Sequence, residues 1–407
     1  MKIWLINHYA VPPQYYPLAR PSLFAKNLIK MGHEVTIIAA STVHNSDLDM
    51  INDGSRVKRE IIDGIPYVFI KCRHYKGNGI DRVINILEFA IKLPRICNSL
   101  DKPDAIVATS FDPLSCYQRV RYAKKHGIKV VAEIADLWPE TLVSYGAAKP
   151  SNPIVKILRQ IEKRIYIKSD AIVFTMAGAY DYILEQGWET SIPRSKVYYI
   201  NNGIDLSEFD FNKRKYVIDD EDLRNPDIYK VIYAGSIRRV NHLGTLLDAA
   251  KLINDSRIRL LIWGSGDELA QLKDRVVSEH IGNVVFKGIV EKKYIPYITS
   301  CADLNIAHGD NSPILRFGLS PNKLFDYLAA GRPVLVDFHS PYNPILDCNA
   351  GFESDGSSAN DIANAIERAC NMSEDEERTY CDAARLGAEQ FDFKVLTQKL
   401  LDVIESV

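Results

Sequence analysis

Short apolar runs rich in β-branched residues recur along the first half of the chain, and amphipathic helical patterns separate most of them. One such pattern, "RPSLFAKNLIKMG", ends at Gly32, as many helices end at a glycine. This alternation predicts β-α-β units, and therefore a parallel sheet covered by helices on both faces. The runs are KIWLINHY from Lys2, HEVTIIAAS from His33, DAIVATS from Asp104, KVVAEIAD from Lys129, DAIVFTM from Asp170 and KVYYINNG from Lys196.

The same alternation restarts after a polar, charged stretch between Asn201 and Asp227, which we interpret as a linker. With 407 residues and 46% hydrophobic composition, the chain is long enough for two domains with cores of their own. We therefore expect an α/β protein with two doubly wound, Rossmann-like domains facing a cleft. The runs of the second half are KVIYAGSI from Lys230, IRLLIWG from Ile258, NVVFKG from Asn283, DLNIAH from Asp303 and RPVLVDF from Arg332.

Charge and cysteine content exclude several classes of protein. Fifty Lys and Arg residues against 52 Asp and Glu give a formal charge of −2, so no global field favours nucleic acid. The seven cysteines include no C-x-x-C pair and lie in or beside apolar runs, which is typical of reduced thiols in a cytosolic protein. The first residues carry no signal-cleavage pattern, and no uninterrupted apolar stretch has membrane-spanning length. We expect a chain that is neither secreted nor membrane-spanning.

The residues that follow the predicted strands are the candidates for a site, because open parallel sheets bind ligands beyond the carboxyl ends of their strands. After "KVIYAG", Gly235 permits a tight turn, and a helix is expected to begin near Asn241. Backbone N–H groups at that helix start, with Arg238 and Arg239 beside them, suit a diphosphate. The alternative is that Gly235 only turns the chain and both arginines are solvated.

A second strand, turn and helix is predicted in "LLIWGSGDELAQLK", with Gly264 and Gly266 in the turn. The stretch matches only the first half of the dinucleotide-binding fingerprint. A tight strand-to-helix turn without a ligand is the alternative.

The richest candidate is "GLSPNKLFDYLAAGRPVLVD", which starts at Gly318. Asn322 and Lys323 lie at a predicted helix start, where the helix dipole favours anions and an ammonium group can neutralise a phosphate. Asp326 lies one turn later on nearly the same face, and its carboxylate can accept hydrogen bonds from the hydroxyls of a ribose. An ordinary surface ion pair between Lys323 and Asp326 is the alternative.

These stretches resemble the retaining, nucleotide-sugar-dependent glycosyltransferases of family 4, which have two Rossmann-like domains of the GT-B type. The likeness extends over nearly the whole chain through "MGHEVTII", "ADLWPE", "YYINNGID", "YAGSI", "NVVFKGIV" and "SPNKLFDYLAAGRPVLV". Within the family, "INHYA", "YKGNGIDRVIN" and "SPNKLFDY" are most similar to bacterial enzymes that extend a lipid-linked O-antigen or capsule precursor, such as N-acetylfucosaminyl and hexosaminyl transferases. The resemblance implies an acceptor-side domain at 1–205, completed by a C-terminal helix at 385–407, and a nucleotide-sugar-binding domain at 206–384.

The resemblance also implies roles for individual residues. Asp326 matches the glutamate that binds the nucleotide ribose, and Ile289 and Val290 match the backbone that reads the base. The implied donor-binding set is Gly235, Ser236, Arg238, Arg239, Gly264, Ile289, Val290, Ser320, Asn322, Lys323 and Asp326. The implied catalytic set is Asp136, Lys323 and Arg238, and the implied acceptor-side residues are His8 and Arg20. A lone histidine after a strand is, alternatively, a structural residue.

Three departures from the family pattern concern the same site. The usual first glutamate, eight residues before Asp326, is Gly318 here, so its role in holding the donor sugar is vacant or is filled by Arg316 or Ser320. The phosphate-loop lysine appears as Asn241, and the arginine beside the first glycine appears as Ser236. The positive charge must then come from Arg238, Arg239 or Lys323. In the first domain, the loop that is usually glycine-rich is "HYAVPPQYYPLARPS".

No metal site is expected. Asp47 and Asp49 have the D-x-D spacing of metal-dependent glycosyltransferases, but they lie in a polar loop after the second predicted strand, and we interpret them as solvated. The histidines form no H-x-x-x-H pair and no cluster with cysteine. The resembling family also acts without metal, so we expect no cofactor beside the UDP-sugar donor.

The segment Tyr75 to Ile96 combines apolar residues at helical spacing with basic residues, and such a helix can lie on an anionic membrane surface. A helix that faces the protein core is the alternative. The apolar residues are Ile80, Val83, Ile84, Leu87, Ala90 and Ile91, and the basic ones are Lys76, Arg82, Lys92 and Arg95.

Together these features predict a cytosolic enzyme, peripheral at the inner face of the cell membrane. We expect it to move a sugar, with retention, from a UDP-sugar to a polyprenyl-diphosphate-linked saccharide in surface polysaccharide synthesis. Two alternatives stay open: a UDP-sugar 2-epimerase, which shares the paired Rossmann-like architecture, and a nucleotide-sugar-binding scaffold without activity, which the departures at Gly318 and Asn241 motivate.

Overall fold

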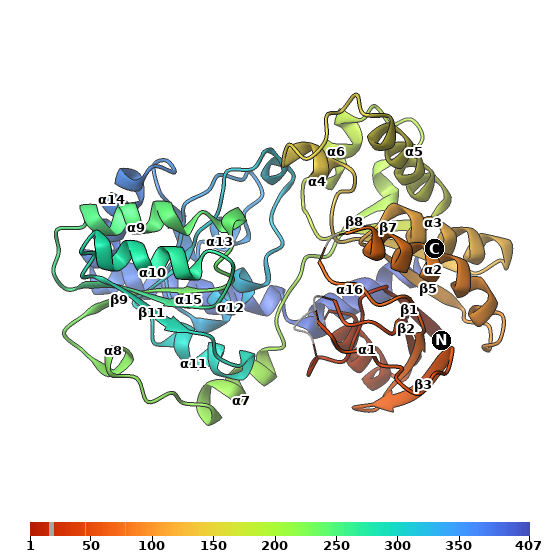
Figure 1. The fold of residues 1–407 in the computed structure, drawn as a ribbon, viewed down its shortest axis with the longest axis horizontal. Helices are drawn as coiled ribbons and strands as arrows, with labels where there is room; N and C mark the ends of the chain where they lie inside the picture. The colour runs from red at the N-terminus through yellow and green to blue at the C-terminus, as the bar shows by residue number, and fades with distance from the viewer. Residues whose placement is uncertain (16–19, 45, 78) are drawn as a thin grey trace. The chain divides into compact units, whose positions relative to one another are not determined.

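The computed structural model describes residues 1–15, 20–44, 46–77 and 79–407. The chain forms two compact units, one of Met1–Asn201 with Phe393–Val407 and one of Asn202–Asp392. Each unit is built on one sheet with helices against it, and the only antiparallel pair among the described strands is at one edge of the first sheet (Figure 1). The prediction of an α/β fold with two doubly wound domains is confirmed.

The first unit has an eight-stranded sheet in the order β3-β4-β2-β1-β5-β6-β7-β8. All neighbouring strands pair in parallel except β3 and β4, which form an antiparallel hairpin at one edge. The strands are β1 (Lys2–Ile6), β2 (Glu34–Ala40), β3 (Val57–Ile62), β4 (Ile65–Ile70), β5 (Ala105–Ser110), β6 (Lys129–Ile134), β7 (Ala171–Phe174) and β8 (Val197–Tyr199).

Helices cover both faces of this sheet because alternate strand residues are apolar on both sides. Ile3 and Leu5 of β1 lie in a core with α1 (Arg20–Lys30) and α16 (Phe393–Glu405), while Trp4 stacks on Tyr122 of α3 (Pro113–Lys125) on the other face. Figure 1 shows the C-terminal α16 beside α1 from the start of the chain. The other helices are α2 (Ile80–Cys97), α4 (Glu140–Ser144), α5 (Pro153–Lys168) and α6 (Ala179–Glu185).

The second unit has a six-stranded, fully parallel sheet in the order β11-β10-β9-β12-β13-β14. In chain order this is the Rossmann arrangement 3-2-1-4-5-6, whose connections reverse between β9 and β12 and so open a ligand site at the carboxyl ends of these strands. The strands are β9 (Tyr229–Ala234), β10 (Ile258–Trp263), β11 (Val284–Gly288), β12 (Leu304–Ala307), β13 (Val334–Val336) and β14 (Gly351–Glu353).

Two apolar cores lie on the two faces of the second sheet. The helices α9 (Leu243–Leu252), α10 (Leu269–Ser278) and α14 (Ala359–Cys370) contribute to one core. The helices α7 (Leu206–Lys215), α11 (Ile295–Ser300), α12 (Asn322–Ala330) and α15 (Glu374–Gln390) contribute to the other. Short helices α8 (Glu221–Arg224) and α13 (Pro344–Asp347) complete the unit.

The expected linker and domain boundaries need correction. The stretch from Asn201 to Asp227 contains α7 and α8, and Leu206 and Phe209 are buried in the core of the second unit. The first unit therefore ends at Asn201 instead of residue 205. Residues 385–392, expected in the first domain, belong to the second unit with the end of α15, and only Phe393–Val407 returns to the first.

Candidate functional site

The loop after β9 is a turn held by its own side chains. Tyr233 donates its hydroxyl hydrogen to the carbonyl of Ser236 at 2.8 Å. The side-chain amide of Asn241 donates to the same carbonyl at 2.7 Å and to the Ser236 hydroxyl at 2.8 Å. His242 then takes a left-handed conformation, with φ of 50°, and α9 begins at the next residue. Asn241 therefore braces the turn at the position where the family has a lysine.

Gly264 and Gly266 are required by a close approach between two loops. A Cβ on Gly264 would lie 1.8 Å from the carbonyl oxygen of Gly235, and one on Gly266 would lie 1.9 Å from that of Ile237. The backbone of Ile237 bonds to the loop after β10 at 2.9 Å through Ser265 and at 3.2 Å through Glu268. Because they lack a side chain, the two glycines allow the loop after β9 to pack directly against the loop after β10.

Arg238 and Arg239 are exposed on this seated turn. Neither side chain makes a hydrogen bond or an ion pair with any residue that the structure describes. Two guanidinium groups are therefore free to bind an anion beside the start of α9.

Lys323 lies in the first turn of α12, and its ammonium lies near Tyr233 at the end of β9. Its ammonium donates to the main-chain carbonyl of His308 at 2.7 Å and lies 4.8 Å from the ring centroid of Tyr233. Burial lowers the pKa of Lys323 to about 8, and the nearby Asp337 carboxylate acts in the opposite direction. The alternative of a surface ion pair with Asp326 is wrong, because this ammonium is held by a backbone oxygen.

Asp326 is buried and pairs with a different lysine. Its carboxylate lies 3.3 Å from the ammonium of Lys292, whose side chain is more than half exposed. The next residue, Tyr327, accepts a hydrogen bond from the N–H of Ala234 at 3.0 Å, at the end of β9. The α12 helix is thereby fixed to the strand that leads into the Gly235 turn, so the Asp326 side chain and that turn are parts of one rigid arrangement.

The backbone before α12 explains why glycine, and not the family's first glutamate, is found at position 318. Gly318 is buried with φ of 111° and ψ of −178°, a conformation that residues with a side chain rarely adopt. Arg316 donates to the carbonyl of Pro313 at 2.5 Å and stacks on Phe317. The Ser320 hydroxyl is buried and has no hydrogen-bond partner among residues 1–15, 20–44, 46–77 and 79–407, so it can accept one from a ligand.

The remaining donor-side residues lie at exposed positions of the second unit. Asn322 is the exposed first residue of α12. Ile289 follows β11 and is 77% exposed, while Val290 is half-buried against the core. The exposed Ile289 is available to a flat, apolar group such as a nucleobase.

His8, predicted on the acceptor side, is a buried residue of the first unit. Its Nε2 lies 2.6 Å from the side-chain oxygen of Asn85 in α2, so Nε2 carries the hydrogen. Burial lowers the pKa of His8 to about 4, which keeps the ring neutral. Tyr9 and Phe89 pack edge-on against the ring. These contacts agree with the structural interpretation of this histidine.

Arg20 and Asp136 differ in how much of each remains available. Each nitrogen of the Arg20 guanidinium donates within the chain, at 2.8 Å to Glu133 and at 2.5 and 2.8 Å to the carbonyls of Asn201 and Ile200. Glu133 in turn accepts from Thr109 at 2.7 Å. Asp136, by contrast, is exposed just beyond β6. Arg20 is therefore engaged within the first unit, whereas Asp136 is exposed to solvent.

Two functional candidates were missed by the sequence interpretation. His308 directly follows β12 and Asp337 directly follows β13, and both side chains are buried. Their side chains bond to each other. Their place after adjacent strands, in "IAHGD" and "VLVDF", was the available signal.

The predicted apolar residues of α2 are divided between core and solvent. The helix packs on the core, as the alternative predicted, through Ala90 of the predicted set and through Asn85, Phe89, Leu93 and Cys97. The outward residues Ile80, Val83, Leu87 and Ile91 are 75%, 49%, 40% and 76% exposed. Of the predicted segments, residue 78 and residues 16–19 of the first-domain loop lie outside the described residues. Across the described chain, no helix is both long enough and apolar enough to cross a membrane.

The D-x-D pair and possible metal ligands were also considered in the sequence. Asp47 and Asp49 form ion pairs with Lys76 and Lys71, each at 2.8 Å. Among the residues that the structure describes, no three His, Cys, Asp or Glu side chains are grouped so as to hold a metal ion.

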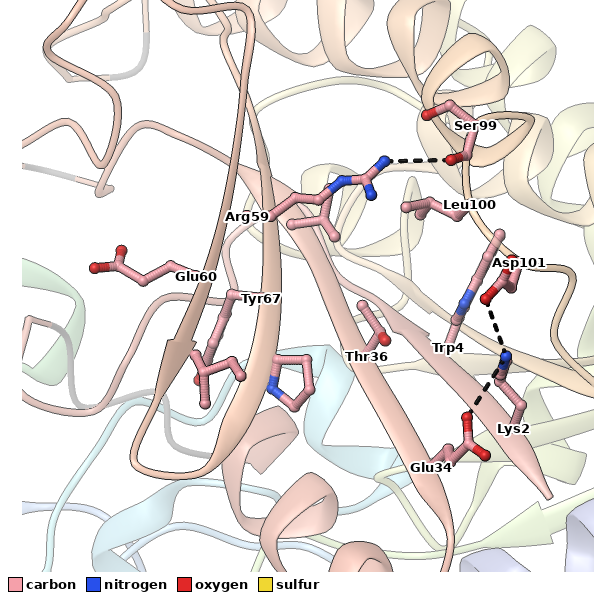
Figure 2. A pocket seen from close by; sticks show the side chains of 13 residues that line it. Lys2, Trp4, Glu34, Thr36, Arg59, Glu60, Tyr67, Ser99, Leu100 and Asp101 are labelled. Atoms are coloured by element: carbon pink, nitrogen blue, oxygen red, sulfur yellow. Dashed lines mark hydrogen bonds and ion pairs between the residues drawn. The ribbon is translucent and has the colours of Figure 1, made fainter.

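A pocket of about 430 Å³ lies elsewhere, near the amino ends of β1 and β2 (Figure 2). Lys2 at its rim lies 3.5 Å from both Glu34 and Asp101, and Arg59 donates to the carbonyl of Ser99 at 3.2 Å. None of the sequence-predicted site residues lines this pocket. Lys2, Glu34 and Asp101 are engaged with one another, and the pocket lies away from the strand ends where parallel sheets bind ligands.

Two known families match the chain, one over most of the first unit and one within the second. Residues 23–208 match the family described as Glycosyltransferase Family 4, and residues 228–372 match the one described as Glycosyl transferases group 1.

Three curated relatives are also glycosyltransferases by description. A candidate glycosyltransferase of Pseudomonas aeruginosa is 21% identical over 64% of this chain and 63% of its own length. A candidate colanic acid biosynthesis glycosyl transferase of Escherichia coli is 24% identical over 76% of each chain. A candidate teichuronic acid biosynthesis glycosyltransferase of Bacillus subtilis is 25% identical over 67% of this chain and 66% of its own length. The chain thus matches just under two thirds of the length of two of these relatives.

Solved structures share the fold at low sequence identity. Sucrose-phosphate synthase from Thermosynechococcus elongatus superposes with a TM-score of 0.72 and 17% identity, over 100% of this chain and 98% of that one. The HepE protein of Anabaena in complex with UDP superposes with a TM-score of 0.70 and 12% identity over the full length of both chains. The first part of the chain thus matches one glycosyltransferase family and the second part another, and the solved structures show that the chain shares their two-domain, GT-B type of fold.

Proposed function

We propose that this enzyme transfers a sugar, with retention, from a UDP-sugar to a polyprenyl-diphosphate-linked saccharide in bacterial surface polysaccharide synthesis. The observation that carries the proposal is the set of side chains around the carboxyl ends of β9 and β12, where Arg238 and Arg239 have no partner among the described residues. The names of the relatives from E. coli and B. subtilis, which refer to colanic and teichuronic acid, support the polysaccharide. The HepE complexes with UDP and UDP-glucose support the donor class.

In this proposal the difficult step is departure of UDP, so catalysis is mainly stabilisation of the charge that grows on the leaving diphosphate. Lys323 and Arg238 supply positive charge, together with the N–H groups at the starts of α9 and α12. Asp326 accepts hydrogen bonds from the ribose, and the unpartnered hydroxyl of Ser320 lies ahead of the same helix. Asp136, exposed after β6 in the first unit, is proposed to meet the reacting sugar or the acceptor.

We propose that these basic residues make a metal ion unnecessary, so that the enzyme needs no cofactor. Steady-state turnover measured with EDTA, with Mg²⁺ and with Mn²⁺ tests this directly. Equal rates are expected in all three. Loss of activity in EDTA with recovery on adding one of the metals would contradict the proposal.

We propose that α2 docks the first unit on the anionic inner face of the cell membrane. Four large aliphatic side chains on its outward face are exposed, and a stable soluble surface rarely leaves such a stripe uncovered. The neighbouring α3 has no acidic residue and exposes Arg121 and Lys125, while Arg95 is exposed on α2. An apolar stripe beside exposed basic residues fits a negatively charged lipid surface.

Vesicle sedimentation tests this surface. Leu87→Asn with Ile91→Asn should reduce binding to vesicles that contain anionic lipid, since each replacement removes exposed apolar area from the stripe. The matched control is Ile61→Asn, because Ile61 on β3 is 73% exposed, close to the 76% of Ile91, but lies outside α2. Equal loss in the control, or no loss in the double variant, would contradict docking through α2.

A panel of UDP-sugars with and without a lipid-linked acceptor tests the reaction itself. Acceptor-dependent release of UDP, with a glycolipid product identified by mass spectrometry, is the expected result. Interconversion of the donor sugar without acceptor would indicate the epimerase instead. Binding of UDP-sugar without any turnover would indicate a scaffold.

A further inference from the structure

The imidazole of His308 connects three elements of the second unit. Its Nδ1 bonds to the carboxylate of Asp337 at the end of β13. Its Nε2 lies 2.9 Å from the main-chain carbonyl oxygen of His242, the residue that ends the turn after β9. Its own carbonyl accepts the ammonium of Lys323 at 2.7 Å. Asp310 adds a second contact to His242, at 3.5 Å from its Nε2.

Both ring nitrogens of His308 are engaged. A carbonyl oxygen only accepts, so Nε2 must carry a hydrogen to bond with His242. On the other side, the Asp337 carboxyl group bonds to Nδ1 and also accepts the N–H of Gly309 at 3.2 Å. His308 is therefore fixed between the turn after β9 and a buried acidic side chain.

The pair of His308 and Asp337 adjoins the turn after β9, which is the proposed binding place of the donor diphosphate. His242 has a left-handed backbone conformation, which places the first N–H groups of α9 and is costly for a residue with a side chain. The hydrogen bond from His308 holds the carbonyl of that residue. Because Lys323 bonds to the carbonyl of His308, one residue sets the positions of both the turn and the lysine.

We propose that His308, held by Asp337, is the positioning residue of the diphosphate site: it fixes the turn after β9 and orients Lys323. The proposal rests on the proposed UDP-sugar binding, but the hydrogen bonds of His308 do not. The charged and titratable groups that face the ring or its neighbours are Asp337 from β13, Lys323 from α12, His242 from the turn, Asp310 from its own loop and Tyr233 from β9.

The hydrogen bonds of His308 are tested on the wild-type protein by nuclear magnetic resonance of ¹⁵N-labelled histidine. The Nε2–H of His308 should be protected from exchange with solvent, because it donates to the carbonyl of His242, whereas the ring of the exposed His339 should not be protected. His308→Gln assigns the signal by deleting it. An Nε2–H of His308 that exchanges as fast as that of His339 would overturn the proposal without any variant having to fold.

The positioning role is tested by calorimetry with UDP and with uridine. His308→Gln should weaken UDP binding by about tenfold, the size expected for one hydrogen bond to a charged group, and should leave uridine binding nearly unchanged. His339→Gln is the matched control, since it removes an exposed histidine of the same unit, and it should change neither affinity.

Asp337→Asn separates positioning from simple packing. It keeps the size of the side chain and an acceptor for Nδ1, but removes the carboxylate that holds the ring. UDP affinity should fall severalfold, while uridine affinity stays near that of the wild type. Unchanged UDP affinity in the folded variant would overturn the role of Asp337 in holding His308. Wild-type protein that fails to bind UDP while the Nε2–H of His308 is protected would contradict the proposed function and leave the hydrogen bonds standing.

Discussion

Arginines near the carboxyl ends of the two sheets are used in opposite ways. In the first unit, Arg119 is buried and the side chain of Arg20 is only 11% exposed, and both donate to the chain itself, Arg20 to Glu133 and Arg119 to backbone carbonyls of two strands. In the second unit, Arg238 and Arg239 are exposed, with no partner in the part of the chain that the structure describes. The arginines of the first unit thus hold its own structure together, whereas those of the second unit are exposed and can bind a ligand.

This difference shows which arginines can contribute free energy to the binding of an anion. A buried guanidinium that already donates to its own chain would have to break those bonds to bind a ligand, whereas an exposed one gives up only water. Mutations in the first group should therefore change stability, and mutations in the second should change ligand binding. The predictions that follow test this contrast.

Arg20→Ala should give the largest effect and should act on stability. It leaves the Glu133 carboxylate buried without its main partner, which costs about 3–5 kcal/mol of unfolding free energy. Urea unfolding measures the loss. UDP affinity of the folded fraction should be unchanged, and a weakened UDP affinity at full stability would show that Arg20 is a ligand-binding residue after all.

Lys323→Ala should lower turnover by about 10²-fold or more, because leaving-group charge is greatest in the transition state. Lys323→Arg should recover little, since the planar guanidinium is larger than the ammonium it replaces. Steady-state kinetics check both variants. If the Michaelis constant rises and turnover is untouched, Lys323 only holds the donor and the leaving-group role passes to Arg238 or Arg239.

The wild-type pH profile sharpens the assignment of Lys323. Its pKa is lowered to about 8 by burial, and only the protonated form carries charge. In the free enzyme, kcat/KM should therefore decline as the pH rises through about 8. Lys323→Ala should lose this limb of the profile, and a variant that retains it would place the titrating group elsewhere.

Asp326→Ala should weaken UDP binding by about 1.5–3 kcal/mol, the usual size for hydrogen bonds to a charged group. Calorimetry on the folded variant measures this. Lys292→Ala is the control, because Lys292 pairs with the same carboxylate but is half exposed. Equal losses in both variants would mean that the ion pair, and not the ribose contact, determines the affinity.

Arg239→Gln should have the smallest effect, a severalfold loss of UDP affinity that shrinks as salt is raised. Its side chain is exposed and makes no bond that folding needs, so thermal unfolding should be nearly unchanged. Destabilisation without a change in affinity would reverse the contrast between the two units.

Local sequence patterns determined the fold class and the frame of the site. The eleven apolar runs that were predicted as strands are all strands, and Gly235, Lys323 and Asp326 do follow or adjoin the strand ends where ligands bind. The hairpin of β3 and β4 was missed although Asp63 and Gly64 between them have the left-handed conformations of a hairpin turn, which "DG" indicates. Strand and helix periodicity are properties of neighbouring residues, so the sequence contains them.

Tertiary structure decided the partners of individual side chains. The sequence placed Lys323 and Asp326 one turn apart, but Lys323 bonds to His308 and Asp326 pairs with Lys292. It suggested a phosphate role for Gly264, whose φ of 147° and closeness to Gly235 instead reflect the contact of two loops. These outcomes depend on which strands become neighbours in the sheet. Contacts between residues far apart in the chain are set by that packing, and no local pattern contains them.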